Sequence, residues 1–242
     1  PKPSQSPRSP VTAKPLTKTV LPKMGDAWAL AERRLRAAIR ASRSVTAKRS
    51  FAAAPGAVRI SGGHIKGRKL AVPDGAGVRP TTDRARETLF NVLTNRFRQA
   101  GGESILVGAR VLDGFAGTGA MGVEAWSRGA AWVSFVENSP QHFSTLKENL
   151  RRAKMPAEAG DAQRSRVGLQ GPFDLIIADP PYEQGLALVQ DLIAEPALFH
   201  AETLLVWERP KTKGDALSLA RWQSVHQTPS GKTVFDFYRP VP

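Results

Sequence analysis

The sequence Asp179-Pro180-Pro181-Tyr182 follows an apolar run at 173–178 and contains residue types suited to activating an amine. An exocyclic amine on a purine is a poor nucleophile, because its lone pair is delocalised into the ring. The Asp179 carboxylate and the Pro180 carbonyl can accept hydrogen bonds from its N–H groups and draw the nitrogen toward tetrahedral geometry. The prolines fix the direction of that carbonyl, and Tyr182 offers a stacking face for a base. A strand followed by a proline-rich turn without chemistry is the alternative.

A second group of residues forms a glycine-rich turn after Asp113, in the sequence Gly-Phe-Ala-Gly-Thr-Gly. Glycines are needed where the backbone turns tightly and a ligand approaches without a Cβ in the way. Glu137 follows Gly117 by twenty residues at the end of the next expected strand, where its carboxylate can accept hydrogen bonds from both hydroxyls of a ribose. The pattern alone fits a dinucleotide site, an S-adenosylmethionine (SAM) site or a purely structural turn. Asp113 favours SAM, since an acid there can hold its amino-acid part but repels a pyrophosphate.

An alternation of strands and helices in residues 101–242 predicts where these motifs lie. The expected strands are ILVGARVLD, AWVSFVE, FDLIIAD and TLLVWER, and SPQHFSTLKENLRRA reads as a helix capped by Ser139. The pattern predicts an α/β fold with a mostly parallel sheet and helices on both faces. RWQSVHQT and KTVFDFYR predict a C-terminal antiparallel hairpin, and no convincing third strand is visible at 154–173. Ligands of such sheets bind at the carboxyl ends of the strands, where both motifs are expected.

The preceding segment, 58–100, predicts a hairpin and a helix. VRISGG and RKLAV read as two short strands joined by HIKG, and RPTTDRARETLFNVLTNRF reads as a helix with a clear start. We therefore divide the chain into an extension at 1–57, this hairpin and helix at 58–100, and a catalytic domain at 101–242.

Composition excludes several functions. The 242 residues contain no cysteine, and the four histidines are scattered without ligand spacing, so thiol chemistry is excluded and no metal site is expected. No apolar run approaches the roughly 20 residues of a membrane span, so we expect no membrane partner. The net charge of +14 is concentrated in residues 1–60, which carry 13 Lys/Arg against two acidic residues. Such a balance favours a polyanionic partner.

The extension at 1–57 is rich in Pro, Ser and Arg. Its first 23 residues cannot bury enough apolar surface to fold alone, whereas the stretch from Asp26 predicts a basic amphipathic helix with Trp28, Leu35 and Ile39 on one face. Such a segment resembles an organelle transit sequence, so we expect an organelle matrix, the mitochondrion before the plastid. A basic extension of an enzyme in the bacterial cytoplasm is the alternative. Either extension is a candidate surface for ribosomal proteins or assembly factors.

Four segments in order carry a resemblance to a known family. Asp-Pro-Pro-Tyr resembles the catalytic motif of amino-group methyltransferases that act on DNA, RNA or protein glutamine. Three further segments narrow it: Arg59–Leu70, with its Gly-Gly and Gly-Arg-Lys-Leu; Arg79–Phe90; and Asp113–Ala130. Over residues 58–239 the chain resembles the RsmD-type 16S rRNA guanine-N2 methyltransferases, whereas residues 1–57 have no counterpart.

This resemblance implies a class I, SAM-dependent enzyme with a Rossmann-like fold that modifies a guanine of small-subunit rRNA during ribosome assembly. It implies catalytic roles for Asp179, Pro180, Pro181 and Tyr182, with no metal. It places SAM contacts on Asp113, Phe115, Gly117, Thr118, Gly119, Glu137 and, near the adenine, Asp161.

A cluster of basic residues before the catalytic domain is a candidate phosphate-binding surface. Its members are Arg59, Lys66, Arg68, Lys69, Arg79, Arg84 and Arg86. Arg86 has a second interpretation, as a partner within the helix or a residue lining the SAM pocket.

Two other functions stay open on the sequence. One is a non-catalytic assembly factor that keeps the methyltransferase shape to hold immature rRNA. The other is an amino-methyltransferase acting on adenine or protein glutamine. The intact Gly-rich turn and Asp-Pro-Pro-Tyr favour an enzyme, and guanine is favoured only by the resemblance.

Overall fold

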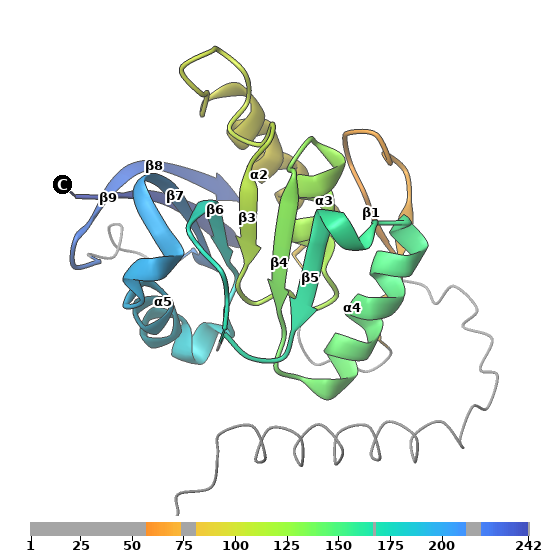
Figure 1. The fold of residues 1–242 in the computed structure, drawn as a ribbon. Coiled ribbons are helices and arrows are strands. Elements are labelled where there is room, and N and C mark those ends of the chain that lie inside the picture. The colour runs from red at the N-terminus through yellow and green to blue at the C-terminus, as the bar shows by residue number, and fades with distance from the viewer. Residues whose placement is uncertain (1–56, 74–80, 167, 212–218, 242) are drawn as a thin grey trace, which may run out of the picture. The chain divides into compact units, whose positions relative to one another are not determined.

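The computed structural model describes residues 57–73, 81–166, 168–211 and 219–241, which belong to one compact unit spanning Phe51–Pro242. Its centre is a seven-stranded sheet of order β5-β4-β3-β6-β7-β9-β8 (Figure 1). The parallel strands are β3 (Arg110–Asp113), β4 (Trp132–Val136), β5 (Gly160–Gln163), β6 (Phe173–Ala178) and β7 (Phe199–Pro210). β8 (Trp222–Ser230) and β9 (Thr233–Pro240) form the predicted hairpin, with β9 antiparallel to β7. The predicted mostly parallel α/β fold is confirmed.

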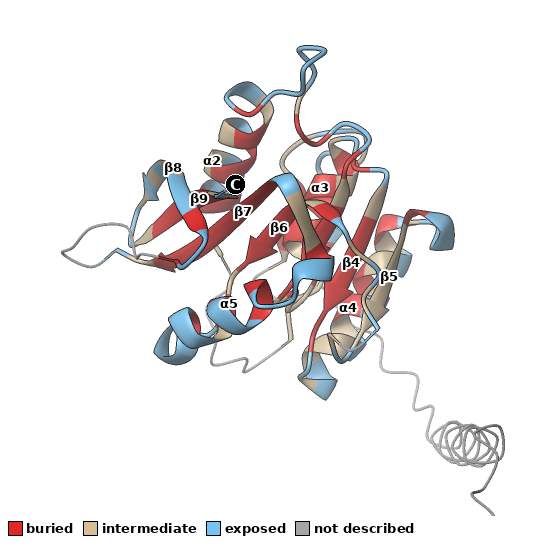
Figure 2. Ribbon diagram, turned by 60° about the vertical axis from the view of Figure 1, so that its left-hand side comes forward, coloured by how far each residue is buried: buried red, intermediate tan, exposed pale blue. Residues whose placement is uncertain are grey.

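Alternation along the strands divides the core between the two faces of the sheet. Leu175 and Ile177 of β6 pack on the face covered by α2 (Asp83–Asn95), α3 (Ala120–Ser127) and α4 (Pro140–Ala153). Ile176 and Ala178 pack on the other face, against α5 (Gly185–Ile193). Buried residues therefore line the central strands on both sides, as expected for parallel strands between helical layers (Figure 2).

Short 3-10 turns complete the described connections, at η1 (Ala157–Ala159), η2 (Tyr182–Gln184) and η3 (Pro196–Leu198). The expectation that no third strand exists at 154–173 is wrong. β5 is only four residues long and half-buried, and it pairs in parallel with β4 at the sheet edge. Its Gly-Asp-Ala-Gln sequence has little strand propensity, so the pairing with β4 decides its conformation.

The predicted N-terminal hairpin and helix join the same core as the sheet. β1 (Val58–Arg59) pairs with β2 (Lys69–Leu70), so that Val58 and Leu70 face inward and Arg59 and Lys69 face outward. Helix α2 begins after Thr82, whose hydroxyl accepts a hydrogen bond from the Ala85 amide. The expected helix in the extension lies outside the described residues, since Ala57 is the only residue of segment 1–57 that the structure describes.

The described residues contain no helix long and apolar enough to cross a membrane. They also contain no group of three or more His, Cys, Asp or Glu residues that could hold a metal ion.

Candidate active site

The glycine-rich turn and the Asp-Pro-Pro-Tyr motif lie at the same edge of the sheet. β3 and β6 are parallel neighbours in which Asp113 is paired with Ile177, and the Gly114 amide donates to the Ile177 carbonyl at 2.9 Å. Asp179 follows Ile177 by two residues, so its carboxyl group approaches that of Asp113, whose pKa it raises. The fold therefore brings together the two motifs that the sequence separates by about sixty residues.

Glu137 holds the glycine-rich turn from the end of the neighbouring strand. Its Oε2 accepts from the Gly117 amide at 2.8 Å and its Oε1 accepts from the Ser139 amide at 2.7 Å. Gly117 and Gly119 have φ values of 52° and 84°, which an L-residue with a Cβ adopts only under strain. A Cβ at Gly117 would meet no heavy atom within 4 Å, so there is open space beside the turn.

Asn149 of α4 supports the same turn, a role that the sequence did not suggest. Its side-chain amide donates to the carbonyls of Thr118 at 2.8 Å and Ala71 at 3.0 Å, and its oxygen accepts from the Ala71 amide. Thr118 thus contributes a backbone contact to the turn, and Phe115 packs partly buried against the core on the α5 face. Asn149 links the end of the N-terminal hairpin to the SAM-site candidates.

Asp113 is a buried carboxyl group close to Asp179 and Glu137. We call this edge of the sheet, with Asp113, Glu137, Asp179 and the open space beside Gly117, the crevice. Asp113 is 2 % exposed, and its Oδ2 accepts from the Gly122 amide at 2.9 Å. The pKa of Asp113 is raised to about 7. Burial is the largest cause, the charges of Asp179 and Glu137 also raise the pKa, and the hydrogen bond from the Gly122 amide opposes them. A cation placed beside Asp113 would restore its ionised form, so the crevice is suited to a positively charged ligand.

The Asp-Pro-Pro-Tyr residues differ in exposure. Pro180 is buried, Asp179 is half-buried, and Pro181 and Tyr182 are exposed, with 55 % of Tyr182 accessible. The pKa of Asp179 is raised to about 6, because the effect of burial exceeds the opposing effect of a hydrogen bond from the Thr81 hydroxyl. The motif therefore presents an acceptor inside the crevice and an aromatic ring at its rim.

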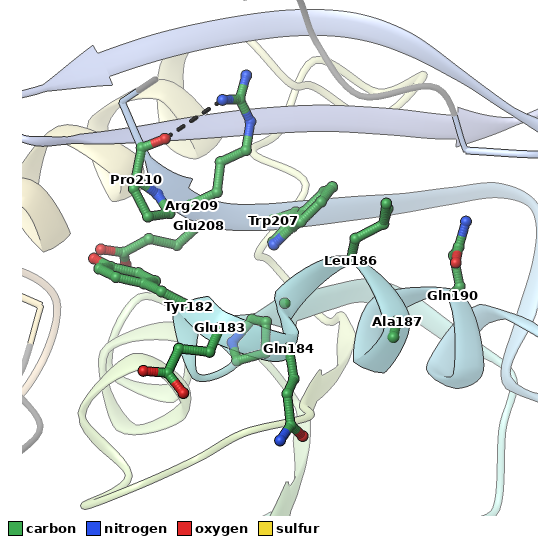
Figure 3. A pocket seen from close by; sticks show the side chains of 12 residues that line it. Tyr182, Glu183, Gln184, Leu186, Ala187, Gln190, Trp207, Glu208, Arg209 and Pro210 are labelled. Carbon is green, nitrogen blue, oxygen red and sulfur yellow. Dashed lines mark hydrogen bonds between the residues drawn. The ribbon is translucent and has the colours of Figure 1, made fainter. Parts of the chain in front are cut away.

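Sequence reasoning missed three residues beside this motif, Thr81, Trp207 and Glu208. The Thr81 hydroxyl lies 2.9 Å from Asp179 Oδ2 and 2.7 Å from Glu208 Oε2. Trp207 and Glu208 of β7 line a pocket of about 450 Å³ together with Tyr182 (Figure 3). The one signal in the sequence was an acidic residue inside the apolar strand TLLVWER, where a buried carboxyl group needs a reason.

Asp161 is not placed with the other SAM candidates. It accepts from the Ser134 hydroxyl at 2.6 Å, and Gln163 donates to its other oxygen. These residues line a different pocket, of about 340 Å³, with Arg110 and Trp132 from the amino ends of β3 and β4. On β5 the Asp161 side chain points to the face opposite Ala162, which packs on the α3/α4 side, and its adenine contact stays a prediction.

Most of the predicted basic surface is exposed. Arg59, Lys66, Arg68 and Lys69 project from the hairpin, and Arg84 projects from α2. Arg79 lies outside the described residues. In the pairing of β1 with β2, Arg59 lies directly opposite Lys69, and two like charges in that position disfavour the hairpin unless an anion lies between them.

Arg86 is the exception, and its assignment to the RNA surface is wrong. It is 1 % exposed, donates to Asp83 Oδ1 at 2.9 Å and to the Arg59 carbonyl, and lies 3.5 Å from the Glu124 carboxylate. Buried in this way it cannot reach a phosphate. Its second interpretation, as a partner within the helix region, is the one the structure supports.

Comparisons with known proteins agree with this geometry. The family model described as conserved hypothetical protein 95 matches residues 58–239. Ribosomal RNA small subunit methyltransferase D of Escherichia coli is 35 % identical over 192 residues, covering 76 % of this chain and 90 % of the relative. The Haemophilus influenzae protein of the same name is 34 % identical, covering 77 % and 95 %.

A solved methyltransferase structure from Escherichia coli has a TM-score of 0.63 at 33 % identity and covers 77 % of this chain and 99 % of its own. Because the family model spans most of the chain and the relatives match over nearly their full length, the chain belongs to the conserved hypothetical protein 95 family, which includes the RsmD-type rRNA methyltransferases.

Proposed function

We propose that this protein is a SAM-dependent methyltransferase that modifies the N2 amine of a guanine in small-subunit rRNA. The observation that carries the proposal is the meeting of two sites at one sheet edge. The Asp113–Gly119 turn with Glu137 supplies a donor site, and Asp179 with Pro180 and Tyr182 supplies an acceptor site beside it. The names of the relatives support rRNA of the small subunit as the substrate.

The residues of the donor site fit the chemistry of SAM. Glu137 can exchange its backbone partners for two ribose hydroxyls, and Asp113 can accept from the ammonium group of the amino-acid part. The carboxyl groups of the crevice repel one another, which a cationic ligand relieves. When bound, SAM supplies an electrophilic methyl group on a sulfonium.

The chain's own residues then act on the guanine. A base that is unpaired or flipped out can stack on Tyr182, a residue that is 55 % exposed. Asp179 and the Pro180 carbonyl accept from the amine N–H groups and orient the nitrogen lone pair toward the methyl group. Asp179 can also take the proton that the nitrogen releases. Catalysis in this scheme is mainly positioning.

The basic surface supplies contacts to the rRNA backbone. Arg59, Lys66, Arg68 and Lys69 come from one hairpin that packs beside α3, and Arg84 comes from α2. Contacts of this kind orient the RNA without reading its sequence. The hairpin therefore binds the backbone of an rRNA element while the residues of the crevice bind the base.

The setting of the reaction is the assembly of the small subunit. The relatives named above are bacterial, which favours the bacterial cytoplasm over the organelle matrix expected from the extension. Ribosomal proteins or assembly factors are the partners that the extension would engage.

The test is methylation of small-subunit rRNA by the full chain, with the modified guanines mapped by mass spectrometry. We expect Asp179→Ala to lower kcat by about 100-fold or more, because the amine loses its acceptor. SAM binding, measured by calorimetry, should be largely retained. Asp191→Asn, at an exposed position on α5, serves as the matched control and should methylate as the unmodified protein does.

Three outcomes would count against the proposal. Normal turnover by the Asp179→Ala variant would remove this carboxylate from the reaction. An unmodified protein that does not bind SAM would instead favour a non-catalytic assembly factor. Methylation of adenine or of protein glutamine would reassign the substrate.

A further inference from the structure

The Thr81 hydroxyl lies between two carboxyl groups. Its Oγ1 is 2.9 Å from Asp179 Oδ2 and 2.7 Å from Glu208 Oε2, and both distances are those of hydrogen bonds. A hydroxyl carries one hydrogen, so it can donate to one of the two carboxyl groups only. The second contact is favourable only if that carboxyl group is protonated and donates to the Thr81 oxygen.

Solvent exposure favours Glu208 as the group that holds the proton. Glu208 is 2 % exposed on β7, whereas Asp179 is half-buried at the crevice. Burial disfavours the charged form more strongly at the less exposed group. Burial, followed by the Asp179 charge, raises the pKa of Glu208 to about 8, although hydrogen bonds from Thr81 and Thr233 lower it. The pKa of Asp179 rises, mainly through burial, only to about 6.

No cation of the described residues offsets this arrangement. The neighbouring Arg209 pairs with Asp236, a buried acid on β9, and alternation along β7 points it away from Glu208. The groups that face Glu208 are Asp179, Thr81 and Thr233, and the charged groups that face Asp179 are Glu208 and Asp113. Glu208 therefore lies among acids and hydroxyls, which favours its acid form.

We propose that Glu208, in its acid form, and Thr81 make a donor chain that positions Asp179 to accept from the substrate amine. Glu208 donates to Thr81 Oγ1, and the Thr81 hydroxyl donates to Asp179 Oδ2. Asp179 Oδ1 is then the oxygen that accepts from the amine. This inference rests on the proposed function and assigns positioning roles to two residues outside the Asp-Pro-Pro-Tyr motif.

The bonds, electrons and proton of the methyl transfer can be followed in this arrangement. The amine lone pair forms the N–C bond, and the C–S bond breaks with its electron pair going to sulfur. The proton that the nitrogen releases passes to Asp179 Oδ1 and from there to water. Glu208 keeps its own proton throughout, so its part is to fix the direction of the Thr81 hydrogen.

The first experiment reads the protonation of Glu208 without substrate or SAM. We compare infrared spectra of the unmodified protein and the Glu208→Gln variant across the pH range. A protonated carboxylic acid shows a carbonyl band that an ionised carboxylate lacks. We expect a difference band near neutral pH that disappears as the pH rises through about 8. Absence of that difference band at neutral pH would overturn the proposal.

The second experiment separates positioning from packing by kinetics. Thr81→Val and Glu208→Leu break the donor chain, and we expect kcat to fall about 10-fold to 100-fold while SAM affinity and Tm change little. Thr81→Ser keeps the hydroxyl and Glu208→Gln keeps a donor, so each should recover most of that loss. Glu202→Gln, at an exposed acid of the same strand, is the matched control.

The pH profile adds the decisive readout. In the unmodified protein kcat should fall as Glu208 ionises above about pH 8, because two carboxylates then compete for one hydrogen. The Glu208→Gln variant cannot ionise there and should lose this alkaline decrease. A kcat for Glu208→Gln as low as that for Glu208→Leu would show that Glu208 acts as an anion. If the unmodified protein methylated no rRNA, the proposed function would fail while the infrared result still decided the state of Glu208.

Discussion

At the scale of single residues, burial separates arginines that look equivalent in sequence. Arg84 and Arg86 are two positions apart in the same helix, yet Arg84 is exposed and Arg86 is 1 % exposed. Arg86 and Arg128 both face Glu124, which is fully buried and also accepts from the amide and hydroxyl of Ser61. Arg86 therefore holds α2, α3 and the N-terminal hairpin together.

We expect Arg86→Ala to lower the free energy of unfolding by about 3 kcal/mol, because it removes one partner of a buried charge. Arg84→Ala should change it by less than about 0.5 kcal/mol, since exposed positions contribute little. Urea denaturation of both variants measures this difference. In RNA binding the order should reverse, with Arg84→Ala reducing the salt dependence of affinity. Equal stability losses for the two variants would contradict the assignment.

At the scale of elements, the N-terminal hairpin is fixed to the end of α3. The His64 amide donates to the Ser127 carbonyl at 2.8 Å, and the Ser127 hydroxyl donates to the Gly62 carbonyl at 2.6 Å. A Cβ at Gly63 would lie 1.7 Å from the Ser127 carbonyl oxygen, so the backbones touch there. The position of the basic hairpin relative to the crevice depends on this contact.

Gly63→Ala and Gly67→Ala test that contact as a matched pair. Both glycines have positive φ, 76° and 87°, but a Cβ at Gly67 meets nothing within 4 Å. Gly67→Ala should therefore cost only the backbone strain, about 1 kcal/mol. Gly63→Ala should cost at least about 2 kcal/mol more, because the hairpin must separate from α3. Thermal unfolding measures both, and a smaller loss at Gly63 would show that the hairpin is not anchored there.

At the scale of the whole molecule, one edge of the sheet collects carboxyl groups from three strands. Asp113 ends β3, Asp179 follows β6 and Glu208 lies near the end of β7. Burial is the main cause that raises the pKa of each, to about 7, 6 and 8 respectively. The folded protein therefore holds protons that the unfolded chain releases near pH 4. Ionising these carboxyl groups in the folded protein lowers the free energy of unfolding, and a bound cation offsets this loss.

This arrangement predicts how stability depends on pH. Because the unfolded chain binds fewer protons than the folded protein between about pH 4 and 8, the contribution of these groups to the unfolding free energy falls as pH rises through that window. Tm should be lower at about pH 8.5 than at about pH 5.5, and Glu208→Gln should reduce the difference. SAM should raise Tm more at the higher pH. A Tm that rises between these two pH values would contradict the raised pKa values.

The sequence by itself determined the order of elements and the residues of the two motifs. Apolar periodicity, the Ser139 cap and the glycine turn are local signals, and they predicted the sheet, the helices and the C-terminal hairpin. They could not predict β5, which exists only because β4 offers a partner.

Only the tertiary structure decided which side chains share the crevice. Thr81, Asp179 and Glu208 lie within hydrogen-bond distance although they are up to 127 positions apart, and no local pattern records that distance. Burial likewise removed Arg86 from the RNA surface. The sequence gives the chemical type of each side chain, whereas its solvation and its partners depend on how the elements pack.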